Sequence, residues 1–170
     1  MTTQAAPPTQ DKAIITGLAE IKVSIDSSSI LTCLGLGSCV AVCCYDPVAG
    51  VAGMAHVVLP SSEGRDTKSP GKYADKAIPT LIEEMKKLGA LKTRLVVKLV
   101  GGAEMSKAAG MDNVFMIGIK NQAAIKEALS KECIKIAAEE LGGNTGRTAR
   151  MAVATGKVTV TSAGSGTIEL

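Results

Sequence analysis

Residues 32–60 read TCLGLGSCVAVCCYDPVAGVAGMAHVVLP and are the most informative segment of the chain. It holds four of the five cysteines and the only histidine of the chain. Two short valine-rich runs, 40–45 and 51–59, flank the turn-forming segment 46–50. Apolar runs of this length that are bounded by turn residues predict two strands joined by a hairpin loop.

The hairpin is expected to bring a thiol and an imidazole together. If the chain folds about Val48, Cys39 lies opposite Val57 and His56 lies opposite Val40, whereas a connection one residue longer puts Cys39 directly opposite His56. Opposed residues of an antiparallel pair have Cβ atoms about 4.5–5.5 Å apart, which is close enough for the two side chains to hydrogen-bond. A slip of one residue changes the face on which a side chain lies, and the sequence leaves the register open.

Length and composition restrict the class of protein. A chain of 170 residues, 46% hydrophobic and 21% charged, is typical of one globular domain with a core. The chain has no tryptophan and one phenylalanine, and its net charge of +3 comes without a basic patch. These features argue against a nucleic-acid-binding surface. No secretory signal and no apolar run of the roughly 18 residues that a membrane span needs are visible. We therefore expect a cytoplasmic protein that does not insert into a membrane.

The cysteines do not form a disulfide pattern. Their number is odd, and the neighbours Cys43 and Cys44 face opposite sides of a strand, so reduced thiols are expected. Together with His56 they also suggest a zinc site. Structural zinc ligands usually come as C-x2-4-C pairs on turns, however, and these cysteines lie along strands, so we do not expect a metal site.

Periodicity and turn residues predict the other elements. The clearest helix is expected at 73–88, where apolar residues recur at three- and four-residue spacing, and Asn121 is expected to cap a second helix that runs to about residue 132. Further strands are predicted at 18–25, 30–34, 95–100, 114–119, 134–138, 151–154 and 157–161. Tails at 1–12 and 163–170 would flank one domain, 13–162. The sum is an α+β domain with mixed or antiparallel sheets and two main helices.

Cys39 and His56 suggest catalysis by a cysteine nucleophile. In such a mechanism a thiolate attacks a carbonyl carbon, a histidine moves the proton, and a further polar group orients the histidine. The glycines before Cys39 allow close backbone approach to a substrate, and the N–H groups around Gly37, Ser38 and Cys39 are candidates for an oxyanion hole. The alternative from the residues alone is a buried core cysteine beside a histidine that caps its own hairpin.

The motif LGLGSC at 34–39, followed by YD at 45–46 and AHVVLP at 55–60, closely resembles the CheD family of chemoreceptor glutamine deamidases. The likeness continues through KYAD at 72–75, GGAEM at 101–105, GGN at 142–144 and TGKV at 155–158, and it spans about residues 18–160.

The resemblance implies a hydrolase of chemotaxis signalling without a cofactor. Such an enzyme converts selected glutamine side chains of methyl-accepting chemotaxis receptors to glutamate and releases ammonia. Cys39 aligns with the family nucleophile and His56 with its general base. The implied fold resembles the cysteine-hydrolase domain of some toxin deamidases, and the implied partner is a CheC-type phosphatase.

The chain departs from the family at one position. The family has a threonine six residues before the nucleophile as a third active-site residue, and here that position is Cys33. A thiol is only a weak hydrogen-bond donor and acceptor. The departure keeps a second function open, a binding partner of the phosphatase with an idle site. A thiol redox sensor is a third reading, but Cys43 lies about 13 Å along the strand from Cys39.

Overall fold

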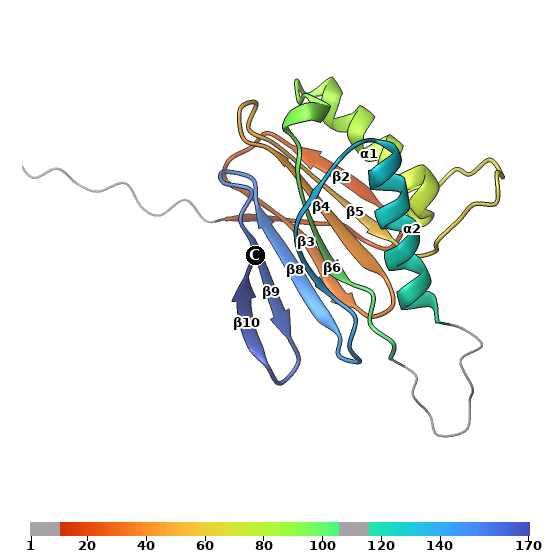
Figure 1. Ribbon diagram of the computed structural model, residues 1–170. Helices are drawn as coiled ribbons and strands as arrows, with labels where there is room; N and C mark the ends of the chain where they lie inside the picture. Colours follow the sequence, from red (N-terminus) through yellow and green to blue (C-terminus); the bar gives the residue numbers. More distant parts are fainter. Residues whose placement is uncertain (1–10, 106–115) are drawn as a thin grey trace, which may run out of the picture.

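Two five-stranded sheets and two α-helices make up the computed structural model, which describes residues 11–105 and 116–170 (Figure 1). The first sheet has the order β1 (Lys12–Ile15), β3 (Ser29–Leu36), β8 (Arg147–Ala152), β9 (Val158–Ser162) and β10 (Gly166–Glu169). The second has the order β2 (Ile21–Ser24), β5 (Val51–Val57), β4 (Val40–Asp46), β6 (Val96–Gly101) and β7 (Ile136–Leu141). The pairs β1–β3 and β6–β7 are parallel and the others antiparallel, which confirms the α+β prediction with mixed sheets.

The second sheet is the middle layer of the molecule. Helices α1 (Ala74–Lys87) and α2 (Ile117–Lys131) cover one of its faces, and the first sheet packs on the other (Figure 1). Short 3-10 turns, η1 (Pro70–Lys72) and η2 (Lys92–Arg94), precede α1 and β6. Strands β4 and β5 are buried along their whole length because both of their faces are covered.

Alternation along β4 divides the core into two clusters. Val40, Val42 and Cys44 face the helices, and Ala41, Cys43 and Tyr45 face the first sheet. Helix α1 contributes one apolar face to the first cluster, at the spacing that the sequence predicted, through Ala74, Ala77, Ile78, Leu81, Ile82 and Met85.

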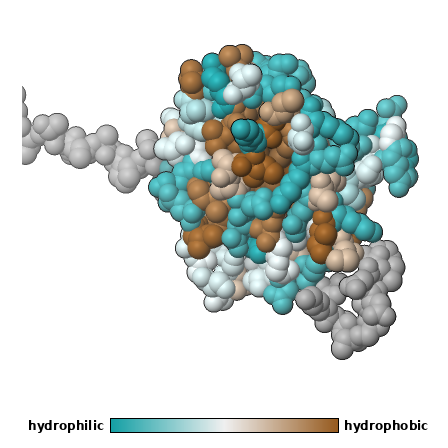
Figure 2. Space-filling model, in the orientation of Figure 1, coloured by the Kyte–Doolittle hydropathy of each residue, from teal (hydrophilic) through white to brown (hydrophobic). Residues whose placement is uncertain are grey.

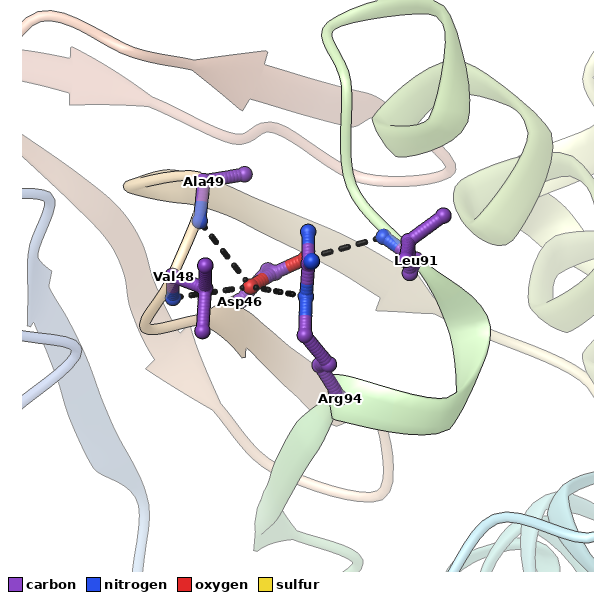
Figure 3. A network of polar contacts seen from close by, with 5 residues as sticks. All are labelled: Asp46, Val48, Ala49, Leu91 and Arg94. Carbon is purple, nitrogen blue, oxygen red and sulfur yellow. Dashed lines mark hydrogen bonds and ion pairs between the residues drawn. The ribbon is translucent and has the colours of Figure 1, made fainter.

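The hairpin of β4 and β5 is fixed at its turn by a buried carboxylate (Figure 3). Asp46 accepts hydrogen bonds from the N–H groups of Val48 at 2.9 Å, Ala49 at 3.1 Å and Leu91 at 2.8 Å. Arg94 pairs with the same carboxylate, Nη2 to Oδ2, at 2.8 Å. Burial alone would raise the pKa of Asp46, but these donors outweigh it and hold that pKa below its usual range.

Several sequence predictions were wrong in detail. The strand expected at 18–25 begins only at Ile21, because Leu18 and Ala19 form a turn. Of the strand expected at 114–119, residues 114 and 115 lie outside the described residues, and Ile117–Ile119 begin α2 instead. The strand expected at 134–138 is β7, which runs two residues later and ends at Leu141.

The two expected tails have different outcomes. Residues 1–10 lie outside the described part of the chain, and Lys12 already belongs to β1. The C-terminal residues are not a free tail, because β10 pairs with β9 from Gly166 to Glu169 and extends the first sheet. A closing hairpin was predicted, but its first strand, β8, runs from Arg147 to Ala152 instead of over 151–154, and β9 runs from Val158 to Ser162 instead of over 157–161.

The surface of the face shown in Figure 2 mixes hydrophilic and hydrophobic residues, with brown patches near its middle inside a largely teal and white surround. Among residues 11–105 and 116–170, no helix is long and apolar enough to cross a membrane.

Candidate active site

The register of the hairpin puts Cys39 and His56 on the same face of the second sheet. Val40 pairs with Val57 and His56 pairs with Ala41, so both expected registers were wrong. The last pair, Asp46 with Val51, leaves a four-residue loop, which is held by the contacts of Asp46. Cys39 directly precedes β4 and is the diagonal neighbour of His56, a relation with a Cα separation of about 7–8 Å.

His56 is buried, with 4% of its surface exposed, and is bonded on several sides. Its backbone N–H donates to Glu20 O at 3.0 Å, and its carbonyl accepts from Ala19 N–H at 3.1 Å. The ring atom Nδ1 lies 3.1 Å from the carbonyl oxygen of Thr16. Because a carbonyl only accepts hydrogen bonds, Nδ1 carries the proton, and Nε2 of the neutral ring is left with a free lone pair.

The two side chains rest in their neutral forms. Burial lowers the pKa of His56, although the Thr16 carbonyl and Glu20 act in the opposite direction. Burial raises the pKa of the half-buried Cys39 thiol, against the effect of its own backbone N–H. Both residues are described, and the structure records no hydrogen bond between them. The resting pair is therefore a thiol and an imidazole that can accept its proton.

Cys33 reaches the same carbonyl as the histidine. It is fully buried on β3, and its Sγ–H donates to Thr16 O at 3.5 Å. Burial raises the pKa of this thiol far above its usual range, so it stays protonated. Cys33, at the position of the family's third active-site residue, thus contacts the Thr16 carbonyl that orients His56.

Thr16 was missed by the sequence reasoning. It follows β1, beside Cys33, because Ile15 of β1 pairs with Thr32 of β3 in parallel. Its carbonyl serves both His56 and Cys33, and its own hydroxyl is buried without a partner in the described part of the chain. The available signal was the alternation of faces along a strand. Thr16 lies two residues after Ile14, which packs against the core between the sheets, so Thr16 is expected on the same inward face.

A bulge leads the chain from the first sheet to Cys39. The pairing of β3 with β8 shifts between Cys33 and Leu36, where Gly35 has a φ of 60° that favours glycine. The chain then crosses to the second sheet through Gly37 and Ser38.

Three successive carbonyls of this crossing accept hydrogen bonds. Ala103 N–H donates to Gly37 O at 2.9 Å, and Gly102 N–H donates to Cys39 O at 2.8 Å. The middle carbonyl, Ser38 O, accepts from Asn121 Nδ2 at 2.9 Å. The backbone passes so close to residue 101 that any side chain there would collide with the Cys39 carbonyl, so this position requires glycine.

Asn121 does not cap α2, as the sequence had suggested. The helix begins at Ile117, and Asn121 lies in its second turn with its side chain buried. Besides Ser38 O, its Nδ2 donates to Val58 O at 2.9 Å. The signal for this role was a polar residue on the inward face of the helix, one turn before the buried Ile125.

The other cysteines take no part in this arrangement. Cys43 and Cys44 are buried in β4, and burial raises the pKa of Cys43 to about 12. Cys133 is exposed, and all five cysteines are free. Within residues 11–105 and 116–170, no group of three or more histidine, cysteine, aspartate or glutamate side chains is placed to hold a metal ion.

Comparison with known proteins identifies the family. The family described as CheD chemotactic sensory transduction matches residues 58–162. A Thermotoga maritima protein named chemoreceptor glutamine deamidase CheD is 48% identical over 152 residues, 89% of this chain and 93% of the relative. The chain belongs to the CheD family. A probable chemoreceptor glutamine deamidase CheD of Desulforamulus reducens is 46% identical, over 88% of this chain and 90% of its own length.

Among solved structures, a Neisseria meningitidis protein of the DUF152 family covers 77% of this chain and 63% of its own. The TM-score is 0.43 and the identity 12%.

Exposed apolar side chains border the candidate site of this CheD protein. Leu18 is 68% exposed and lies between Thr16 and Ala19, both of which contact His56. Leu34 is 52% exposed and follows Cys33, and Met105 is 57% exposed beside Gly37. These three residues, here called the apolar rim, come from three separate segments, and each lies next in sequence or in space to a residue that contacts the site or leads to Cys39.

Proposed function

We propose that this protein is a chemoreceptor glutamine deamidase that hydrolyses selected glutamine side chains of methyl-accepting chemotaxis proteins to glutamate and releases ammonia. The observation that carries the proposal is the placement of Cys39 and His56 on one face, with Nε2 of His56 free to accept a proton. The names of its CheD relatives support the choice of substrate.

The first half of the mechanism forms a thioester. His56 Nε2 takes the proton of Cys39 while the sulfur adds to the carboxamide carbon of the glutamine. The carbonyl oxygen becomes an oxyanion, which the N–H groups around Gly37, Ser38 and Cys39 stabilise. The C–N bond then breaks, and the imidazolium of His56 returns its proton to the departing ammonia.

Water completes the reaction. His56 takes a proton from the water as its oxygen adds to the thioester carbonyl, and a second oxyanion forms in the same place. The C–S bond breaks, His56 returns its proton to the sulfur of Cys39, and the product leaves as a carboxylic acid, which gives its proton to the released ammonia through water. Cys39, His56 and water account for every bond and proton in this sequence.

The third active-site role is divided in this proposal. The main-chain carbonyl of Thr16 orients the His56 ring at 3.1 Å, and the Cys33 thiol supports that carbonyl from the other side at 3.5 Å. A main-chain group holds the histidine tautomer in many sites of this kind. Activity therefore does not require a hydroxyl at position 33.

The apolar rim is the surface that we assign to the receptor. Leu18, Leu34 and Met105 are exposed and would offer contacts to the apolar side chains of a helix. We further propose that a CheC-type phosphatase, the partner that the family resemblance implies, binds the same rim. The free cysteines suit a reducing compartment, and we place the reaction in the cytoplasm.

The test is incubation of a receptor cytoplasmic fragment with the protein, followed by peptide mass spectrometry and an ammonia assay. We expect a mass gain of roughly 1 Da at particular glutamines, with one ammonia released for each, as hydrolysis of a carboxamide through an acyl-enzyme requires. A receptor that keeps all its glutamines, with a catalytic amount of folded protein present, would contradict the proposal.

A further inference from the structure

We infer that Asn121 is a positioning residue that orients the Ser38–Cys39 peptide, so that the Cys39 N–H points to where the oxyanion forms. The inference rests on the proposed function, because it assigns a part to that mechanism. It concerns a side chain of α2 that is remote in sequence from both Cys39 and His56.

The inference rests on the geometry of the Ser38–Cys39 peptide unit. In a trans peptide the C=O and the following N–H point in opposite directions. Asn121 Nδ2 holds Ser38 O at 2.9 Å, on the side of α2. The Cys39 N–H of the same peptide must then point the other way, and it does lie beside the Cys39 thiol. When the Cys39 sulfur attacks a carbonyl carbon, the oxyanion on that carbon forms next to the Cys39 N–H.

The hydrogen bond from Asn121 to Ser38 is one of two that this buried side chain makes to separate segments. Asn121 is fully buried, and the same Nδ2 also donates to Val58 O at 2.9 Å, so one amide ties the start of β4 to the end of β5. The other amide atom, Oδ1, is buried without a partner in the described part of the chain. A buried acceptor without a partner is unfavourable, so the favourable contribution of this side chain lies in the two carbonyls that it holds.

His56 does not depend on Asn121 for its position. Its ring is held by Thr16, and its backbone by Glu20, Ala19 and the pairing with Ala41. Removal of the Asn121 amide should therefore free the Ser38–Cys39 peptide to rotate, while proton transfer from the thiol to the histidine continues.

Two reactions of Cys39 separate these effects. Acylation by p-nitrophenyl acetate passes through an oxyanion and needs the N–H, whereas alkylation by iodoacetamide displaces iodide at a saturated carbon and needs only the thiolate. Neither reagent requires receptor recognition. Peptide mass spectrometry at Cys39 distinguishes this site from the exposed Cys133.

The variants are Asn121→Asp, which replaces the donor by an oxygen of the same shape, and Asn121→Ala. We expect acylation of Cys39 to fall by about 10²–10³-fold, the usual effect of losing one oxyanion donor. The rate of alkylation should change by less than about threefold, because the Cys39 thiol can still transfer its proton to His56. Ile125→Val, one turn along α2 and buried, is the control, and both of its rates should stay at the unmutated level.

Equal losses of acylation and alkylation, or unchanged acylation in both Asn121 variants, would overturn the inference. Failure of both variants to fold would also overturn it, because the role would then be structural. So would an unmutated protein that is alkylated but not acylated at Cys39. Acylation that depends on Asn121, in a protein that leaves receptors unchanged, would instead refute the proposed substrate and keep the positioning role.

Discussion

At the scale of single residues, the proposed mechanism requires His56 to be neutral. Its pKa is lowered by burial, so the ring stays unprotonated further into the acid range than an ordinary histidine does. We expect the acid limb of kcat/KM for receptor deamidation to lie below pH 6.5, the ordinary value. A pH series on a receptor fragment measures it. A limb above pH 6.5, or full activity of His56→Ala, would refute the general-base role.

The same residue affects stability with a definite sign. Because the folded-state pKa of His56 is lowered, the unfolded chain binds a proton more readily than the folded one. The stabilisation associated with the neutral ring is complete above pH 6.5, the unfolded value, and is lost as the pH falls below it.

Position 33 is tested by a pair of variants of equal shape. Cys33→Thr places a hydroxyl where the thiol now donates to Thr16 O at 3.5 Å, and Cys33→Val fills the space without a donor. Because a hydroxyl is the stronger donor, kcat of the threonine variant should exceed that of the valine variant by about fivefold, the equivalent of one hydrogen bond of about 1 kcal/mol. Equal kcat values would show that the Thr16 carbonyl needs no support from this position.

At the scale of elements, Asp46 holds the hairpin that carries His56 and begins directly after Cys39. Asp46→Ala removes the acceptor of three backbone N–H groups and of Arg94, so it should lower the free energy of unfolding by about 3–5 kcal/mol. In a chain of this length the Tm should fall by about 6–20 °C. Calorimetry measures both quantities. Glu83→Ala, which breaks an exposed pair with Lys86, should cost less than about 1 kcal/mol.

The effect of Asp46 should also depend on pH. Its folded-state pKa is lowered, so its contribution is present above the unfolded value of 3.8 and is lost as the pH falls through the folded one. The difference between Asp46→Ala and the unmutated protein should therefore narrow below about pH 4. A constant difference down to lower pH would mean that the ion pair does not stabilise the hairpin.

Most helices and strands could be predicted from the sequence, but the register of the β4–β5 hairpin could not. Two valine-rich runs around a turn were enough to predict β4 and β5. The register depends on Asp46, whose partners Leu91 and Arg94 lie more than 40 residues away, and no local pattern encodes such contacts. Asn121 was misread for a similar reason, since the carbonyls that it holds belong to strands distant in sequence.

At the scale of the whole molecule, the candidate site forms where three segments meet. The sequence indicated His56 because it is the only histidine of the chain, and Cys39 through the glycines before it and the resemblance of LGLGSC to the CheD family. It did not indicate Thr16, because a main-chain carbonyl carries no residue signature and becomes available only when β1 pairs with β3. The layering of two sheets likewise follows from tertiary contacts rather than from any one run of residues.

The apolar rim gives a prediction at this scale. Leu18→Glu should raise KM for a receptor fragment by about tenfold, because it places a charge where a helix is expected to pack, a cost of about 1.4 kcal/mol. Val48→Glu is the matched control. Val48 is 73% exposed, but it lies in the turn at the opposite end of the hairpin, and KM should not change. Equal KM values in the two variants would place the receptor elsewhere.

The phosphatase proposal predicts competition for the same surface. A CheC-type phosphatase titrated into the assay should raise the apparent KM for the receptor without changing kcat, and Leu18→Glu should weaken its binding. Cys39→Ala should still bind it in a pull-down, because loss of one sulfur removes little contact area. Undiminished deamidation at saturating phosphatase would mean that the two surfaces are separate.

The central claim, that Cys39 is the nucleophile of a glutamine deamidase, is tested most directly by comparing two cysteine variants from the same segment. Cys39→Ala should lower the rate of receptor deamidation by more than about 10⁴-fold, as loss of a nucleophile does in other acyl-transfer enzymes. Cys44→Ala, in which the buried thiol faces the helices, should keep the rate close to that of the unmutated protein. Mass spectrometry of the receptor fragment measures both. Conversion of glutamine to glutamate by folded Cys39→Ala at the unmutated rate would contradict the account.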